Sequence, residues 1–278
     1  MELPRSSHVT SNATISVVIP CFNSAKTIER ALRSVESQTT KPHEVLVVDD
    51  ASSDNTVSVI EQYERSSSLN IRVIKQSANG GPSVARNAAW NVSTGEFVAF
   101  LDADDQWHPQ KLETQLNAML PNPKIVMSFH DHLFGSSEQF ETLPFAPTTS
   151  QATLHNYLVR NRSATPTVML RTALSERFLN TKRYAEDYLL WMTIIASRGS
   201  ALHIHATLAH CSNPGYGGSG QSGKLWKMER SELSGFVSLW RSGALSLPTL
   251  VAVSIWSITK YLLRLFDTFL IPIRRRRL

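Results

Sequence analysis

The sequence predicts an α/β fold in which a mostly parallel sheet is covered by helices on both faces. Short β-branched apolar runs alternate with segments of helical periodicity through the first 120 residues, and the connections between them are short. In such an arrangement each helix is the crossover between two parallel strands. The expected strands are Ile15–Pro20, His43–Val48, Ile71–Ile74 and Glu96–Leu101, and the expected helices are Lys26–Gln38, Asn55–Tyr63, Ser83–Val92 and Pro109–Leu120. Because ligands of such sheets bind beyond the carboxyl ends of the strands, we expect the chemistry to follow each strand.

The pattern becomes less regular after residue 120. One more strand is expected at Ile125–His130, a polar loop at Gly135–Ser150, and helices at Leu154–Val159 and Tyr188–Ser197. The chain thus divides into a flexible tail at 1–14, a domain at 15–225 with halves at 15–120 and 121–225, and a helical tail at 226–278.

A glycine-rich segment at 212–223 is too rich in turn residues for a regular element and is expected to form a mobile lid. Its end, Gly218–Lys224, satisfies the first seven positions of a phosphate-binding P-loop. Leu225 stands where that motif needs Ser or Thr to meet Mg²⁺, which excludes an ATPase of this kind.

The charge and the cysteines limit the classes of function. A formal charge of +5 and a pI near 9.3 are compatible with nucleic acid, a membrane or a small anion as partner. Four arginines lie together at 274–277, and no basic stripe alternates with aromatic residues, so nucleic acid binding is disfavoured. Cys21 and Cys211 are too few for a disulfide framework and are expected to be buried, reduced side chains. The polar Met1–Thr14 does not resemble a signal peptide, so the active part is expected to face the cytoplasm.

The apolar segment Leu247–Ile273 is interrupted before it reaches a clean transmembrane length. Ser257, Lys260, Arg264 and Asp267 recur at steps of three and four, which places them on one face of a helix. With Arg274–Arg277 behind it, this amphipathic helix is expected to lie along an anionic membrane surface. A helix packed on the domain or on another subunit, and a true membrane span, remain alternatives.

Acidic side chains gather at the expected carboxyl ends of the strands. Asp49-Asp50 and Asp102-Ala103-Asp104-Asp105 supply five carboxylates, which repel one another unless a cation lies between them. Mg²⁺ or Mn²⁺ takes carboxylate oxygens and fills its remaining positions with phosphate and water. The sequence therefore predicts a divalent cation that holds a nucleotide diphosphate.

Four segments in order resemble the family 2 glycosyltransferases with the GT-A fold, in particular bacterial enzymes of cell-surface polysaccharide assembly. They are Ile15-Ser-Val-Val-Ile-Pro-Cys-Phe-Asn23, Val47-Val-Asp-Asp-Ala-Ser-Ser-Asp-Asn-Thr56, Gly81-Pro-Ser-Val-Ala-Arg-Asn87 and Phe100-Leu-Asp-Ala-Asp-Asp105. The resemblance covers residues 15 to 225 and implies a Rossmann-like sheet, a nucleotide-diphosphate-sugar donor, metal dependence and inversion at the transferred sugar. It makes 15–120 the nucleotide-binding half and 121–225 the acceptor half.

The resemblance assigns roles to the donor side. Asp50 is expected to accept a hydrogen bond from the base, which favours a UDP-sugar, with Asp49 beside it and the backbone of Pro20 and Phe22 flanking the ring. Arg86 follows the glycine-rich turn, where its guanidinium could pair with the donor phosphates.

The D-x-D segment is expected to hold the metal. By the resemblance Asp104 binds the cation and Asp102 binds the ribose or the cation. A lone D-x-D is a weak signal, but here it follows an apolar strand and precedes Trp107.

Transfer also needs a base that takes the proton from the acceptor hydroxyl. Glu186-Asp187 precedes an apolar helix and matches the family's E-D motif, so Asp187 is the expected base and Glu186 its neighbour or an acceptor contact. Without the upstream motifs, two carboxylates here would be explained by the helix dipole.

The sequence departs from the family after its last strand. Many relatives carry an arginine in a short motif there, whereas this chain has His210-Cys211-Ser212 and then glycines. His210, Ser219 and Ser222 are candidates for contacting the leaving phosphates, and Trp226 could anchor the loop or stack on a sugar.

Two other functions deserve comparison with glycosyl transfer. A nucleotidyltransferase would share the sheet and the carboxylates, but Pro20–Asn23 lacks the glycine-rich basic loop expected near its first strand. A non-catalytic nucleotide-sugar scaffold at the membrane would be expected to lose Asp104 or Asp187, and both are present. The expected enzyme therefore acts as a peripheral protein on the cytoplasmic face of the cell membrane.

Overall fold

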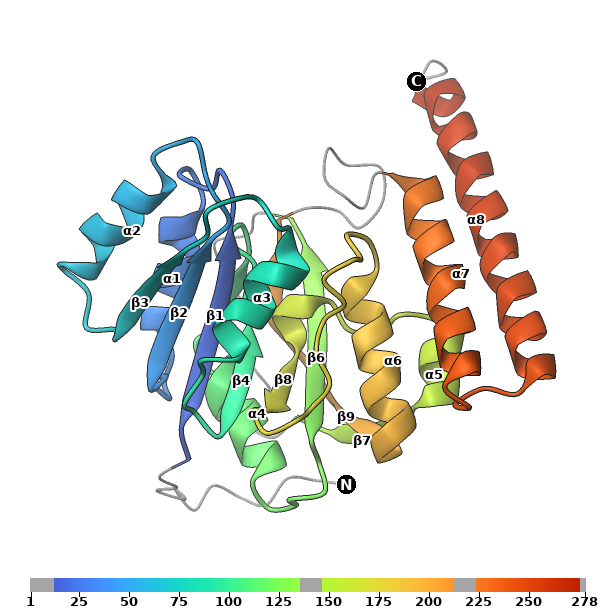
Figure 1. Cartoon of the computed structure of the whole chain (residues 1–278), viewed down its shortest axis with the longest axis horizontal. Helices are drawn as coiled ribbons and strands as arrows, with labels where there is room; N and C mark the ends of the chain where they lie inside the picture. The colour runs from blue at the N-terminus through green and yellow to red at the C-terminus, as the bar shows by residue number, and fades with distance from the viewer. Residues whose placement is uncertain (1–12, 136–146, 213–223, 276–278) are drawn as a thin grey trace.

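The computed structural model describes residues 13–135, 147–212 and 224–275. A nine-stranded mixed sheet runs through the described chain, and helices pack on both of its faces (Figure 1). The α/β class predicted from the sequence is confirmed. The strands are β1 Ile15–Cys21, β2 Glu44–Asp49, β3 Ile71–Lys75, β4 Phe97–Phe100, β5 Gln106–Trp107, β6 Met127–Phe134, β7 Thr149–Thr153, β8 Met169–Arg171 and β9 Ser200–Cys211.

The first half of the sheet is parallel. β1 lies between β2 and β4, and β3 lies beyond β2, all in parallel register. Every residue of β2 is buried, and in β1 only Pro20 is partly exposed, which fits strands covered on both faces. Alternate β1 residues serve two cores: Val18 packs in one of them, and Val17 and Ile19 pack in the other.

The helices follow the expected positions closely in the first half of the chain. Two cores result: α1, α2 and α4 contribute to the one around Val17, while α3, α5, α6 and α7 contribute to the one around Val18. The helices are α1 Ile28–Glu36, α2 Thr56–Glu64, α3 Pro82–Trp90, α4 Lys111–Met119, α5 Leu154–Val159, α6 Glu186–Arg198, α7 Leu225–Arg241 and α8 Leu247–Arg275, with a 3-10 turn at Thr165–Thr167.

The second half of the chain extends the same sheet. β8 pairs antiparallel with β4 and β6, and β9 pairs parallel with β6 and antiparallel with β5 and β7. Strands β5, β8 and β9 were not expected from the sequence, and the polar loop expected to continue to Ser150 ends where β7 begins at Thr149. Residues 136–146 of that loop and 213–223 of the expected lid lie outside the described residues.

The C-terminal helices form a pair at one end of the molecule (Figure 1). α7 packs on the rest of the fold, because Phe236 and Leu239 are buried in the larger core. α8 packs along α7 with its polar stripe inward: Ser257 donates to Glu232 at 2.9 Å and Lys260 pairs with the same carboxylate at 3.2 Å. The expected amphipathic helix is present, but its polar side contacts α7.

Candidate active site

Strained backbone marks the loops at the expected site. Among the described residues, three other than glycine have positive φ: Asn23 at 50° after β1, Ala51 at 60° after β2, and Ala185 at 49° before α6. A non-glycine residue in this region costs of order 1–3 kcal/mol, and such residues cluster at functional sites. The loops after β1 and β2 also hold each other, since Asn23 N–H donates to Ser52 Oγ at 2.9 Å and Ser53 N–H donates to Asn23 Oδ1 at 2.8 Å.

Asp50 connects the end of β2 to the glycine turn before α3. Its two carboxylate oxygens each accept a backbone N–H, from Gly80 and from Gly81, both at 2.8 Å. Gly81 has φ of 86°, a conformation that side chains other than glycine rarely adopt. Asp49, equally buried, accepts from Ser52 N–H at 3.2 Å. Base recognition by Asp50 stays a prediction, and the structure adds that Asp50 shapes the turn.

Arg86 joins the two acidic motifs. From α3 its guanidinium contacts Asp102 after β4 at 2.7 Å and Glu186 at the start of α6 at 3.0 Å, and the side chain is only 6% exposed. Burial alone would lower the pKa of Arg86, but the carboxylates of Asp102 and Glu186 outweigh it and raise that pKa, so the guanidinium is charged. Both of its terminal nitrogens thus have carboxylate partners. The phosphate contact expected for Arg86 stays a prediction.

Side chains and backbone from α1 and from the end of β9 form hydrogen bonds with the D-x-D segment. Arg30 on α1 donates to the backbone carbonyl of Asp104 and to Ser212 Oγ, the latter at 2.7 Å, and Ser212 N–H donates to Asp105 Oδ1 at 2.8 Å. Burial, together with the carboxylates of Asp102 and Asp104, raises the pKa of Asp105 to about 8. The raised pKa shows that the carboxyls of this segment repel one another, and a divalent cation bound beside Asp104 would relieve that repulsion.

Asp187 lies in the first turn of α6, which begins at Glu186 rather than after the acidic pair. Its carboxylate accepts from its neighbour Tyr188 N–H at 2.7 Å and from Thr165 Oγ1 at 3.1 Å. Burial and the adjacent Glu186 raise the pKa of Asp187 to about 6, against the opposing effect of Arg86. A partly exposed carboxylate with this pKa is suited to accept a proton near neutral pH.

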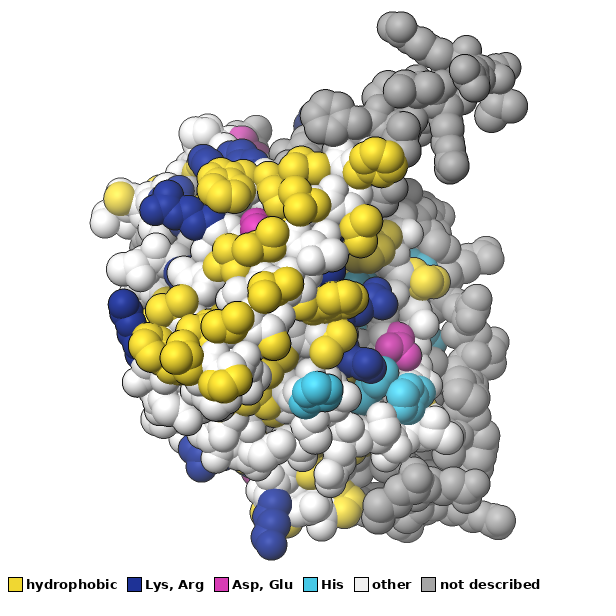
Figure 2. All heavy atoms as spheres, turned by 90° about the vertical axis from the view of Figure 1, so that its right-hand side faces the viewer, with side chains coloured by type: hydrophobic (Ala, Val, Ile, Leu, Met, Phe, Trp, Pro, Cys, Tyr) yellow, Lys and Arg dark blue, Asp and Glu magenta, His cyan; other side chains and the backbone are white. Residues whose placement is uncertain are grey.

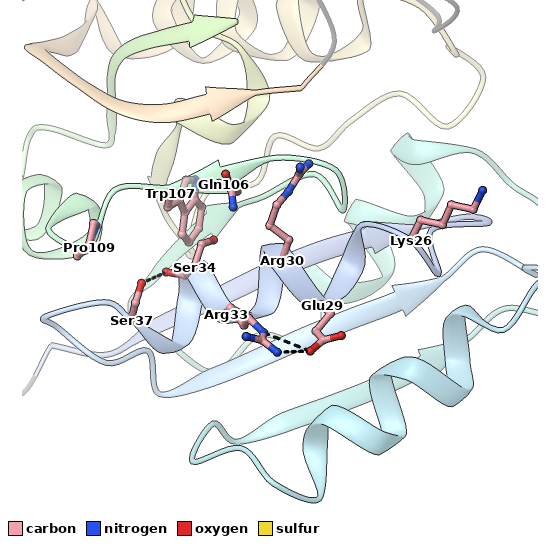
Figure 3. A pocket seen from close by; sticks show the side chains of 9 residues that line it. All are labelled: Lys26, Glu29, Arg30, Arg33, Ser34, Ser37, Gln106, Trp107 and Pro109. Carbon is pink, nitrogen blue, oxygen red and sulfur yellow. Dashed lines mark hydrogen bonds and ion pairs between the residues drawn. The ribbon is translucent and has the colours of Figure 1, made fainter. Parts of the chain in front are cut away.

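An open groove of about 550 Å³ lies on the α1 side of the D-x-D segment (Figure 3). Arg30 points from α1 toward that segment, whereas Arg33 pairs with Glu29 lower on the same helix. None of Asp50, Asp102, Asp104 and Asp187 lines this groove, so it does not correspond to the expected donor cleft.

The remaining sequence candidates have mixed placements. Phe22 is 47% exposed at the end of β1, and His210 is buried at the end of β9 opposite Gln106. Ser219 and Ser222 lie outside the described residues, and Trp226 is exposed at the start of α7 near Tyr261 of α8. Both cysteines are free and buried, as expected.

Sequence reasoning missed three supporting side chains. Arg30 and Ser212 fix the D-x-D backbone, and Thr165 holds Asp187. Of the three, Ser212 alone lies in a segment that the sequence singled out, His210-Cys211-Ser212. The other two carry no local pattern, because their partners lie far away in the sequence.

The fold and this arrangement define a class: an α/β protein in which a D-x-D segment follows a central parallel strand and a buried arginine joins that segment to an acidic pair at the start of a helix. The family model described as Glycosyl transferase family 2 matches residues 16–178, more than half of the chain. The chain belongs to this family.

Two curated relatives match over most of their length. One is the UDP-Glc:alpha-D-GlcNAc-diphosphoundecaprenol beta-1,3-glucosyltransferase WfgD of Escherichia coli, 33% identical over 65% of this chain and 69% of that protein. The other is the putative teichuronic acid biosynthesis glycosyltransferase TuaG of Bacillus subtilis, 30% identical over 70% of this chain and 77% of that protein.

Solved structures confirm the GT-A architecture. TarS of S. aureus in complex with UDP-GlcNAc aligns with TM-score 0.65 and 23% identity over 91% of this chain and 73% of that one. The mannosyltransferase PcManGT of Pyrobaculum calidifontis, in complex with GDP-Man and Mn²⁺, aligns with TM-score 0.66 and 20% identity over 93% and 75%. At these identities the likeness establishes the fold alone.

Proposed function

We propose that the chain transfers a sugar from a nucleotide-diphosphate sugar to a hydroxyl of a lipid-linked saccharide, with inversion, in cell-surface polysaccharide synthesis. The observation that carries the proposal is the contact of Arg86 with both Asp102 and Glu186, which brings the donor motif and the acceptor motif to one place. A non-catalytic scaffold would not need Asp187 and its raised pKa beside that contact.

The donor side is built to bind a diphosphate. Asp50 and the turn it shapes lie at the end of β2, in position for the base of a UDP-sugar, with Phe22 beside it. Asp104, supported by Asp102, would hold Mg²⁺ or Mn²⁺, which neutralises charge on the leaving diphosphate when bound. Arg30 and Ser212 keep the D-x-D backbone in place for that contact.

The acceptor side supplies the base. In the proposed single displacement Asp187 removes the proton from the acceptor hydroxyl as it attacks the anomeric carbon opposite the leaving group, so the configuration inverts. A positioned base of this kind contributes about 10²–10⁴-fold to the rate.

A binding panel tests the donor assignment. Wild-type protein and the Asp104→Ala variant are titrated with UDP-, GDP- and other nucleotide sugars, with Mn²⁺, with Mg²⁺ and with chelator. We expect one donor to bind the wild type far better with metal present, and the variant to lose that metal-dependent increase because its principal ligand is gone. Equal titrations for both proteins would contradict the role of Asp104.

The acceptor proposal rests on the relatives and on the chain's apolar end. The name of WfgD specifies a diphosphoundecaprenol-linked acceptor, a substrate that resides in a membrane. We extend that substrate class to this chain and place the enzyme peripherally on the cytoplasmic face of the membrane.

The exposed side of α8 supports membrane attachment. Figure 2 shows apolar side chains spread over this face, and Ile255, Leu262 and Phe266 are about 60% exposed. The segment Leu247–Phe266 is long and apolar enough to cross a bilayer, yet only 6% of it is buried in the protein. An apolar face of this size on a protein surface typically marks an interaction site.

The orientation of α8 favours lying on the membrane over crossing it. Its polar stripe is held by Glu232 of α7, and α7 also carries Arg230 and Arg241, which would be costly in the bilayer core. A helix fixed to α7 therefore presents its apolar face to the interface while α7 stays in water. The arginines at 274–277, whose side chains lie outside the described residues, would follow at the level of anionic headgroups.

A further inference from the structure

Two histidines and an aspartate, residue types that can ligate a metal, lie together on the sheet at a distance from the D-x-D segment. Asp131 of β6 and His203 and His205 of β9 have ligand atoms that all lie within 4.8 Å of one another. His203 Nε2 is 2.8 Å from Asp131 Oδ1. Figure 2 shows histidine side chains gathered with an acidic group on the face that also carries α8.

The strand pairing explains why these residues meet. His203 and His205 are two apart on β9 and point to the same face of the sheet, and Phe129 of β6 pairs with His203. Asp131, two residues after Phe129, shares that face. Irregular register between His130 and Asp131 interrupts the ladder there, and β-bulges of this kind redirect side chains at functional positions.

The two imidazoles are held in orientation by neighbours that are not ligands. The Phe129 ring stacks on His203 with centroids 4.5 Å apart and an interplanar angle of 7°. Ser150 of β7 lies 2.9 Å from His205 Nε2, which leaves Nδ1 of the same ring for a ligand. Metal-binding histidines in proteins are usually fixed in this way through their second nitrogen.

The donor set selects the kind of cation. Two imidazoles and one carboxylate suit Zn²⁺, which is tetrahedral in such sites and would keep water in the fourth position, whereas Mg²⁺ prefers oxygen ligands. Burial lowers the pKa of His203 against the opposing effect of Asp131, and the positive charge of Arg162 nearby would act against a bound cation.

The group is separate from the donor site. At the usual rise per residue of a strand, Cys211, which ends β9 beside Asp105, is about 25 Å from His203 and about 13 Å from Thr207, the partner of Asp131 on β9. We propose that Asp131, His203 and His205 form a zinc-type site that joins β6 to β9, independent of the cation held by Asp104.

Zinc titration of tag-free, metal-stripped protein tests this proposal. The Asp104→Ala variant serves as the background, so that any binding at the D-x-D segment is weakened. We expect one Zn²⁺ per chain, with a higher unfolding temperature when Zn²⁺ is present. Adding Asp131→Asn, which keeps the shape of the side chain, or His205→Ala, at an exposed position, should weaken Zn²⁺ binding by about tenfold or more.

The matched control is His155→Ala, which removes an exposed histidine of α5 outside the group and should leave Zn²⁺ binding unchanged. The proposal is overturned if the background protein binds no Zn²⁺, or if Asp131→Asn and His205→Ala bind it as tightly as the control. Zinc binding that persists while donor binding fails would separate this site from the proposed transferase activity.

Discussion

Arg86 shows how one buried charge organises a site. Placing a guanidinium in the protein interior is costly, and the cost is offset only if carboxylates with good geometry surround it. Asp102, after β4, and Glu186, at the start of α6, provide these contacts. Arg86 is therefore best described as a positioning residue that sets the distance between the D-x-D segment and α6.

Removal of Arg86 should destabilise the protein as well as inactivate it. In Arg86→Met two carboxylates lose their partner in a poorly hydrated place, and we expect a loss of about 3–5 kcal/mol in the free energy of unfolding, measured with urea. The control is Arg33→Met, whose ion pair with Glu29 is exposed and should contribute almost nothing. If Arg86→Met kept wild-type stability and only weakened donor binding, phosphate contact would be its main role.

Asp187 should set the acid limb of the pH profile. A base must be ionised to accept a proton, and the pKa of Asp187 is raised to about 6. The transfer rate kcat/KM should thus be constant above that pH and fall about tenfold per unit below it.

Thr165 allows the assignment to be checked. Its hydroxyl donates to the ionised carboxylate of Asp187 and so lowers the pKa. In Thr165→Val the acid limb should move upward by about 0.5–1 pH unit, the equivalent of one hydrogen bond. An unmoved limb would mean that a different group is titrating.

At the scale of elements, the parallel half of the sheet was predictable because β1, β2 and β4 are buried on both faces. Continuous apolar runs such as Val45–Val48 are typical of such strands, and the helices between them have an apolar face. The missed strands lack such a signal: β5 and β8 have two and three residues, too few to show a period. In β9 the histidines His203 and His205 alternate with apolar residues, but this alternation is short and was not predicted to be a strand.

The residues of the candidate site were predictable from sequence motifs, but the contacts between these residues were not. Asp104, Asp187 and Arg86 were found because they lie in recognisable segments, whereas the pairing of Arg86 with Glu186 joins residues 100 positions apart. The polar stripe of α8 was also found, but its direction depended on Glu232 of α7, which no periodicity indicates.

The exposed face of α8 should bind anionic vesicles. In Leu262→Asp a charge replaces an apolar side chain that is 57% exposed, and vesicle binding measured by sedimentation should weaken by about tenfold or more. Val92→Asp, a matched change at an exposed residue of the α3 end, should bind as the wild type does.

A second copy of the chain is the competing occupant of this face. A dimer that Leu262→Asp separates, combined with no binding of wild-type protein to anionic vesicles, would contradict the membrane proposal. Vesicle binding that falls with added salt would support the contribution of the basic end.

At the scale of the whole molecule, the sheet brings the proposed donor and acceptor residues together. The D-x-D segment follows β4, β8 pairs with β4, and α6 begins with Glu186, which Arg86 joins to Asp102. The α7–α8 pair lies at the end of the molecule beyond α6 (Figure 1), so a membrane against α8 would be on the acceptor side of the site. This geometry suits a water-soluble donor and a lipid-linked acceptor that arrive from different directions.

The most direct test of the account compares wild-type protein with Asp187→Asn in two assays on the same preparation. Donor binding is measured with the nucleotide sugar found in the panel, and transfer is measured as acceptor-dependent release of the nucleotide diphosphate. The account predicts that Asp187→Asn binds the donor as the wild type does and transfers at least about 10²-fold more slowly. Retained transfer by Asp187→Asn, or no acceptor-dependent release by the wild type with any nucleotide sugar, would contradict it.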